Sequence, residues 1–157
     1  MAIRAFGYLS IMKAVIQRVS KASVKIDEQK PRAISKGLVI LLGVGQKDSL
    51  EDVIILGKKI LNLRIFQKNN KMDLSIQDIK GSLLIVSQFT LYADCTRGNR
   101  PSFINAAKPV HAKKIYTEFV NYMRNQSIMV QTGVFGEQMA VSLINDGPVT
   151  LIMNTNQ

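Results

Sequence analysis

The segment GLVILLGVGQKDSLEDVIILGKKILNL, residues 37–63, decides the fold because its hydrophobic period changes within a few residues. Leu38 to Val44 is a continuous apolar run of strand length, which is typical of a central strand covered on both faces. Asp48 and Ser49 are both N-cap residue types, and acids stand early and lysines late in the segment that follows. The residues at helical, core-facing spacing are Leu50, Val53, Ile54, Gly57, Ile60 and Leu61. We therefore expect a buried strand followed by an amphipathic helix.

The residues on either side of this segment add further strands. Lys13 to Val19 alternates, and Ala22 to Ile26 continues the alternation after Ser20-Lys21, which predicts a hairpin or one long bulged strand. Gln67 to Met72 is polar and typical of a turn. After Gly81, the apolar run Leu83 to Val86 predicts another interior strand, which ends in the polar residues of the stretch 87–92.

A second helix and three strand candidates complete the chain. Pro109 is suited to the first turn of a helix, on which Ala112, Ile115, Phe119, Tyr122 and Met123 share one face. The strand candidates are Ile128 to Thr132, Met139 to Ile144 and Val149 to Met153. The order strands, helix, strand, helix, strands favours a single α+β domain over a doubly wound α/β sheet.

Composition excludes several classes of protein. A chain of 157 residues is about one domain, with enough length to bury a core without staples. Cys95 is the only cysteine and His111 the only histidine, so disulfide frameworks and classical zinc motifs are excluded, and a reducing cytosol fits best. The longest apolar run, Gly37 to Gly45, is too short to span a bilayer, and the first eleven residues lack the features of a secretory signal.

The net charge of +10 indicates a polyanionic partner, chiefly nucleic acid. No segment is a basic amphipathic helix of the kind that binds membrane surfaces, so the charge favours tRNA or rRNA over lipid. A solvated basic surface without a partner is the alternative interpretation.

Two segments carry polar residues that a purely structural interpretation does not explain. In LLIVSQFTLY, residues 83–92, Ser87, Gln88 and Thr90 interrupt an apolar strand, where unpaired polar groups would cost about 1–3 kcal/mol each. They indicate either a site or local backbone hydrogen bonds at a strand end. NDGPVT, residues 145–150, is either a tight hairpin turn or a rigid Gly-Pro peptide presented to a ligand.

Conventional catalytic groups are scarce. Cys95 lies beside Asp94 and near Arg97, whose charge favours a thiolate, but the sequence supplies no paired base. His111 lies at the start of a lysine-rich helix and is expected on the surface. The carboxylates form neither an adjacent pair nor a set with metal-ligand spacing. The residues alone therefore offer no complete set of conventional catalytic or metal-binding groups.

Taken together and in order, the motifs resemble a known family. MKAVIQRVSKASV, NLRIF, VSQFTLYAD, GNRPSF and TGVFGEQMAVSLINDGPVT are similar to the D-aminoacyl-tRNA deacylases, also called D-tyrosyl-tRNA deacylases. The signatures SQxxLY and NxGPVT are intact at residues 87–92 and 145–150. The resemblance runs from Met12 to Asn154. It implies a domain over residues 12–154, an N-terminal extension over 1–11 that is disordered or a misassigned start, and a tail over 155–157.

The resemblance implies a cytoplasmic homodimer that hydrolyses the ester of D-aminoacyl-tRNA or glycyl-tRNA, with a compact, barrel-like mixed sheet carrying two helices. It implies no cofactor, no metal, and neither a membrane nor DNA as a partner. The family's Gly-cis-Pro pair matches Gly147-Pro148, whose carbonyls would enter the partner's pocket and exclude L-amino acids.

Site roles are carried over by position. Ser87 and Gln88 would contact the ester or the terminal adenosine, and main-chain N–H groups at Phe89 and Thr90 would stabilise the oxyanion. Thr90 would shape the site rather than act as a nucleophile. Phe135 and Met139 would line the adenosine pocket, with core packing as the alternative. Arg18 would hold the Gly-Pro segment in place. The residues that would contact tRNA phosphates are Arg97, Arg100, Lys108, Lys113 and Lys114.

Two other classes stay open at this point. A non-catalytic tRNA- or rRNA-binding module would use the same basic surface, with binding that weakens steeply as salt rises. A thiol-dependent hydrolase would depend on Cys95.

Overall fold

The structure is a computed structural model that describes residues 11–157, so the expected extension at residues 1–11 lies outside the described residues except for Ile11. Eight strands, two α-helices and one short 3-10 helix make up the described chain. In chain order they are β1 (Lys13–Lys25), β2 (Arg32–Ile34), β3 (Gly37–Gly43), α1 (Leu50–Asn62), β4 (Phe66–Lys68), β5 (Lys71–Leu74), β6 (Ser82–Ser87), η1 (Phe89–Tyr92), α2 (Pro109–Arg124), β7 (Met129–Thr132) and β8 (Ala140–Asn154).

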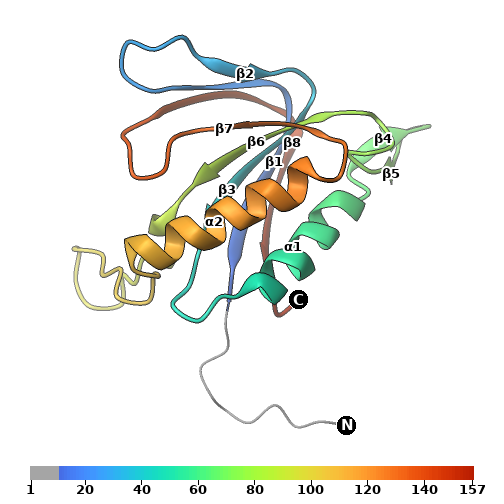
Figure 1. Cartoon of the computed structure of the whole chain (residues 1–157). Coiled ribbons are helices and arrows are strands. Elements are labelled where there is room, and N and C mark those ends of the chain that lie inside the picture. The colour runs from blue at the N-terminus through green and yellow to red at the C-terminus, as the bar shows by residue number, and fades with distance from the viewer. Residues whose placement is uncertain (1–10) are drawn as a thin grey trace, which may run out of the picture.

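Six of the eight strands form a mixed, strongly curved sheet. Across the sheet, β8, β1, β3, β6 and β7 follow one another, and β2 continues β3 along the same edge of β1. The β3–β6 and β6–β7 pairs are parallel, whereas β1 runs antiparallel to β2, β3 and β8. The curvature brings β2 into contact with β7, and both helices pack on one face (Figure 1). The predicted α+β class with a barrel-like sheet and two helices is confirmed.

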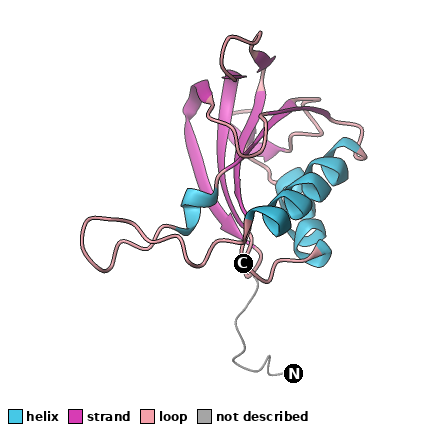
Figure 2. Cartoon of the chain, turned by 60° about the vertical axis from the view of Figure 1, so that its left-hand side comes forward, coloured by secondary structure: helices cyan, strands magenta, loops and turns pink. Residues whose placement is uncertain are grey.

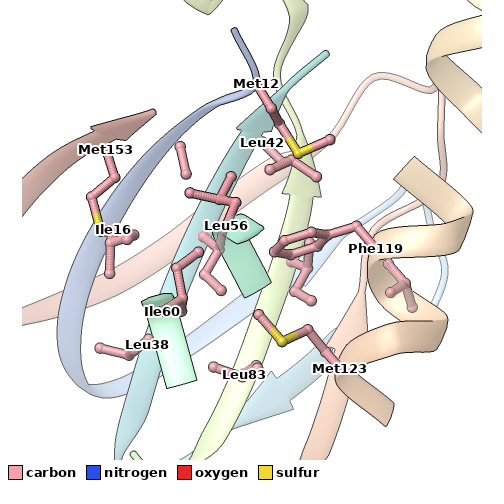
Figure 3. Packing of buried hydrophobic residues seen from close by; sticks show 14 of the residues in the cluster. Met12, Ile16, Leu38, Leu42, Leu56, Ile60, Leu83, Phe119, Met123 and Met153 are labelled. Atoms are coloured by element: carbon pink, nitrogen blue, oxygen red, sulfur yellow. The ribbon is translucent and has the colours of Figure 1, made fainter. Parts of the chain in front are cut away.

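Most of the apolar run Leu38 to Val44 forms β3, and both faces of this strand are covered, as predicted. Leu38 and Leu42 point toward the helices, where they pack with Leu56 and Phe119 (Figure 3), and Ile40 belongs to the same core cluster. Val39 lies on the opposite face in a second cluster inside the curve of the sheet. Alternation along one strand therefore supplies two hydrophobic layers.

The two helices begin as the sequence predicts. Ser49 caps α1, and its N–H donates to the Asp52 carboxylate at 2.8 Å. Pro109 opens α2. Four of the residues expected on the core face of α1 are buried: Val53, Gly57, Ile60 and Leu61. The prediction is wrong at Leu50 and Ile54, which are exposed. Asp52 and Leu56 are buried instead. The expected face of α2 is buried except at Tyr122, which is half-buried. No helix in the described part of the chain is long and apolar enough to cross a membrane.

Three local predictions differ from the structure. The polar stretch Gln67 to Met72 does turn, at Asn69 and Asn70 with positive φ, but short strands on both sides pair into a separate hairpin. The strand expected to run into residues 87–92 ends at Ser87, and a 3-10 helix follows. The hairpin-turn interpretation of residues 145–150 is wrong, because β8 is one strand that continues along β1 on both sides of this segment. Instead of a hairpin, β1 itself is the long strand with register shifts that was one of the two alternatives.

Candidate functional site

A cavity of about 790 Å³ opens at the carboxyl end of β6. Its floor comes from the end of β6 and the start of η1, one side from the loop that leads into α2, and the other from the loop between β7 and β8. The lining residues are Gln46, Val86, Ser87, Gln88, Phe89, Phe103, Ile104, Ala106, Ala107, Lys108, Pro109, Ala112, Phe135, Gly136, Glu137, Met139 and Val141. The volume falls in the range of small-ligand sites.

The first signature motif divides between the cavity and its support. Ser87, Gln88 and Phe89 line the cavity, and Phe89 leaves 55% of its surface exposed beside the edge-on ring of Phe103 at 5.0 Å. Thr90 is exposed but does not line the cavity, and its hydroxyl accepts a hydrogen bond from the Gln88 amide. The main-chain N–H groups of Phe89 and Thr90 open a 3-10 helix, where N–H groups have no acceptor one turn earlier.

Tyr92, the last residue of the motif and of η1, anchors this short helix to the core. The ring is buried between β3 and the start of β1, where the hydroxyl donates to the Ile11 carbonyl and the Lys13 ammonium lies 4.5 Å from the ring centre. A Cβ at Gly45 would lie 2.7 Å from the Tyr92 hydroxyl, so only glycine leaves room for this ring. Burial, together with the nearby carboxyl of Asp48, raises the pKa of Tyr92 well above its usual value.

Asp48 lies next to this tyrosine and is itself 2% exposed. One carboxyl oxygen accepts the Gly45 N–H at 2.6 Å, while the other has no hydrogen-bond partner among residues 11–157. Burial raises the pKa of Asp48 to about 7, and the Coulombic effect of Asp52 also raises it. The ring of His111 contacts the Asp48 main-chain oxygen at 2.9 Å rather than facing the cavity.

The opposite wall consists of the loop between β7 and β8. Phe135 and Met139 both line the cavity. The Phe135 ring packs at 5.9 Å from Tyr116, a buried residue of α2 whose hydroxyl donates to the Ile85 carbonyl at 2.9 Å and whose pKa burial raises to about 12. Phe135 also packs against the larger core cluster, and Met139 packs against the smaller one. Each side chain therefore both lines the cavity and packs against the core.

The second signature motif forms a bulge in β8. Gln17 pairs with Thr150 and Val19 with Asn145, so one residue of β1 faces residues 146–149. The Asn145 amide donates to the Thr150 hydroxyl at 2.8 Å and its oxygen accepts the Val149 N–H at 2.9 Å, which ties the base of the bulge. The Gly147–Pro148 peptide bond is cis, a property that the sequence alone left open.

The residue of β1 that faces the bulge is Arg18, which is 5% exposed. Its Nε donates to the Asp146 carbonyl at 3.0 Å, and its Nη1 donates to the Ile65 carbonyl at 2.6 Å. The structure therefore brings Arg18, Gly147 and Pro148 together, as the sequence predicts. None of the three lines the cavity of their own chain, and Gly147 and Pro148 are exposed to solvent.

The predicted phosphate contacts lie on one side of the cavity. Lys108 lines it, and Lys113 and Lys114 are exposed on the first turns of α2. Arg97 and Arg100 are exposed in the loop over residues 93–108, which extends away from the body of the protein between η1 and α2 (Figure 2). Cys95 is exposed in the same loop and does not line the cavity.

Sequence reasoning missed several lining residues. Phe103 stands in the quoted GNRPSF segment, and Glu137 in FGEQM, but neither received a role. Gln46 and Ile104 carry no signal, because nothing in the local sequence marks a loop residue whose side chain the fold brings to the cavity. Membership of a quoted motif was the one signal that could have found Phe103.

Comparisons with known proteins agree with this geometry. Residues 15–154 match the family described as D-Tyr-tRNA(Tyr) deacylase. The D-aminoacyl-tRNA deacylase of Thermosipho africanus is 54% identical over 147 residues, which cover 93% of this chain and 99% of that protein.

Two solved structures share the fold. One, described as c-Myc DNA Unwinding Element Binding Protein, has a TM-score of 0.84 and 36% identity, covering 90% of this chain and 97% of that one. The other, described as a probable eukaryotic D-amino acid tRNA deacylase, has a TM-score of 0.79 and covers 92% of this chain and 99% of that one. Its sequence identity is 16%, so this likeness supports the fold alone.

The curved sheet, the cavity at the end of β6 and these likenesses define a hydrolase that acts on ester bonds. Within that class, the chain belongs to the D-Tyr-tRNA(Tyr) deacylase family, whose relatives with about half of their residues in common are named D-aminoacyl-tRNA deacylases. The resemblance found in the sequence motifs is thereby confirmed.

Proposed function

We propose that the chain hydrolyses the ester between a D-amino acid, or glycine, and the terminal adenosine of tRNA, and that it spares L-amino acids. The observation that carries the proposal is the meeting of two motifs at one cavity: Ser87 and Gln88 on the floor, Phe135 and Met139 on the facing wall. The floor would take the ester, and the largely apolar wall would take the adenine.

The chiral filter in this proposal is the bulge at Gly147 and Pro148. A second copy of the chain has to supply it, since the bulge does not line the cavity of its own chain and stands exposed. Arg18 holds the neighbouring Asp146 carbonyl at 3.0 Å, which supports a bulge of fixed position. The active unit is therefore a homodimer in which each copy completes the other's cavity.

Handedness follows from the geometry of the α-carbon. With the ester on the floor and main-chain oxygens of the bulge on one side, an L-amino acid directs its side chain at those oxygens, whereas a D-amino acid directs only its α-hydrogen at them. Exclusion of this kind does not depend on the identity of the side chain. Glycine has no Cβ and passes the same filter.

The chemistry requires little from side chains. The aminoacyl ester is already activated, and the neighbouring ribose hydroxyl of the substrate assists attack or positions water. The N–H groups of Phe89 and Thr90 would stabilise the developing oxyanion, and one such donor is typically worth about 10²–10³ in rate. The Thr90 hydroxyl already accepts from Gln88, and the only histidine contacts Asp48, so the histidine is not placed to activate Thr90 as a base.

Basic residues would hold the rest of the acceptor stem. Lys108 stands at the cavity, and exposed Lys113 and Lys114 continue its charge along α2. Arg97 and Arg100 extend it onto the loop. Such contacts position a nucleic acid by its phosphates and make binding weaken with salt.

The test is deacylation of three substrates, D-Tyr-tRNA, Gly-tRNA and L-Tyr-tRNA, by the purified protein. We expect turnover of the first two and none of the third; equal turnover of both tyrosine enantiomers would contradict the chiral filter. A second candidate, a nucleic-acid-binding module without catalysis, is favoured by the charge and by the likeness to the protein described as a DNA unwinding element binding protein. Salt-dependent binding of uncharged tRNA or DNA without ester cleavage would establish that alternative.

A further inference from the structure

Arg32 lies where the curved sheet brings β2 against β7. It is the first residue of β2, which continues the line of β3 along the same edge of β1, and β7 is the strand that follows β6 in the sheet. The two strands are in contact at the same side of the sheet (Figure 1), yet no main-chain ladder joins them within residues 11–157. Instead, Nη1 of Arg32 donates to the main-chain oxygens of Thr132 at 2.9 Å and Gly133 at 3.2 Å.

These two oxygens are the last acceptors of an edge strand. The β6–β7 ladder ends at the pair Ile85 and Thr132, and the chain leaves the sheet at Gly133. Main-chain groups at a sheet edge need partners, and a guanidinium offers charged donors in a fixed plane. Because the Gly133 N–H also donates to the Ile85 oxygen at 3.4 Å, both polar groups of Gly133 are held.

The cavity wall begins at this clamped point. Met139 packs directly on Gly133, where a Cβ would lie 2.2 Å from its sulfur atom. Phe135 follows two residues after Gly133 and packs against Tyr116. Both lining side chains therefore depend on the backbone position that Arg32 fixes from a strand 100 residues earlier, although Arg32 itself does not line the cavity.

We propose that Arg32 is a positioning residue for substrate binding: by joining β2 to β7 it holds Phe135 and Met139 in place to receive the adenosine end of the substrate. This inference rests on the proposed deacylase function of the cavity. The donors expected to stabilise the oxyanion stand on η1, in a different part of the cavity lining, and Arg32 itself does not line the cavity. Loss of the clamp therefore affects KM and leaves kcat nearly unchanged.

The experiment is steady-state deacylation of Gly-tRNA by the wild type and by Arg32→Leu, Arg32→Lys and Arg64→Leu. Arg64 is the matched control, since it also donates to a main-chain oxygen, that of Asp73 at 3.1 Å, but on the separate β4–β5 hairpin. We expect Arg32→Leu to raise KM by about tenfold with kcat within about twofold, the size of one lost charged hydrogen bond. Arg32→Lys keeps hydrogen-bond donors on a shorter side chain, so its KM should lie between those of Arg32→Leu and the wild type. The KM of Arg64→Leu should equal that of the wild type.

A second measurement does not depend on activity. With methyl-labelled methionine, the Met139 resonance, assigned through Met139→Leu, should move or broaden in Arg32→Leu while that of the core residue Met12 stays in place. An active wild type with an unchanged KM in Arg32→Leu, or an unchanged Met139 resonance, would overturn the role of Arg32. An inactive wild type would overturn the proposed function instead. If Arg32→Leu does not fold, a wild-type KM in Arg32→Lys overturns the inference.

Discussion

The guanidinium of Arg18 holds the main-chain oxygen of Asp146 at 3.0 Å, across 128 residues of sequence. Its Nη1 reaches in the other direction to the Ile65 oxygen at 2.6 Å. One buried side chain of β1 thus ties the exposed bulge of β8 to the chain segment that follows α1. The position of the bulge therefore depends on a residue in the first strand.

The first prediction concerns this arginine. Arg18→Leu leaves two main-chain oxygens without their charged donor, so we expect a loss of about 2–3 kcal/mol in the free energy of unfolding, measured in urea. In the folded variant the bulge is no longer held, and deacylation of L-Tyr-tRNA should rise relative to D-Tyr-tRNA. Arg18→Lys should lose less stability than Arg18→Leu. A folded Arg18→Leu variant with the wild-type preference for D-Tyr-tRNA would contradict the role of Arg18 in the filter.

The second prediction compares two glycines that both have positive φ. A Cβ at Gly147, φ +129°, would lie 2.8 Å from an Arg18 guanidinium nitrogen and 2.9 Å from the Val149 side chain, whereas Gly98, φ +76°, has nothing within 4 Å. We expect Gly98→Ala to cost about 1 kcal/mol for its backbone conformation alone and Gly147→Ala about 2–3 kcal/mol.

Activity separates the two glycines further. Deacylation of D-Tyr-tRNA should fall by about tenfold or more in Gly147→Ala, since a misplacement of about 1 Å at a substrate-positioning group has large effects on rate. It should stay near the wild-type rate in Gly98→Ala. Equal activity of the two variants at a temperature where both are folded would show that the bulge takes no part in the reaction.

The third prediction tests whether a side chain performs the chemistry. Thr90→Ala removes one exposed hydroxyl and the hydrogen bond it accepts from Gln88, and we expect kcat/KM to stay within about tenfold of the wild type. Removal of a true nucleophile costs about 10⁶ in kcat in a serine hydrolase. Cys95→Ser, in the exposed loop, should be silent. Inactivity of Thr90→Ala with intact folding and tRNA binding would assign covalent catalysis to Thr90.

Much of the fold could be predicted because local pattern and tertiary environment agree. The run 38–44 is apolar on both faces, and β3 is covered on both faces. The predictions failed where distant partners decide the structure. Leu50 and Ile54 fit a helical stripe, but the stripe that the sheet and α2 cover is rotated toward Leu56, and no single-helix pattern contains that information.

The site shows the same division. Residues within the quoted motifs, such as Ser87 and Phe135, line the cavity as the motifs suggest. NDGPVT has every residue type of a hairpin turn, yet its turn-forming residues make a bulge, because β1 is long enough to pair with β8 on both sides of it. The contact of Arg32 with Thr132 and Gly133 carries no sequence signal, because it depends on how far the sheet curves.

The fourth prediction concerns the pH dependence of stability. Burial raises the pKa of Asp48 from 3.8 to about 7, so between these values the folded protein binds a proton that the unfolded chain has released. The contribution of Asp48 to stability is therefore fully present below about pH 4, declines as pH rises, and is lost above about pH 7. Asp48→Asn keeps an oxygen for the Gly45 N–H and cannot ionise.

We therefore expect Asp48→Asn to gain stability relative to the wild type between pH 5 and pH 8, by roughly 1–2 kcal/mol after a discount for solvent screening. Urea unfolding at the two pH values measures this difference. Asp27→Asn is the matched control for an exchange of aspartate for asparagine, because Asp27 is exposed and has a positive φ that asparagine also tolerates. If the stability difference between Asp48→Asn and the wild type does not change with pH, then Asp48 is ionised in the folded protein throughout this range, and a cation or a water molecule must partner the carboxyl oxygen that has no hydrogen-bond partner among residues 11–157.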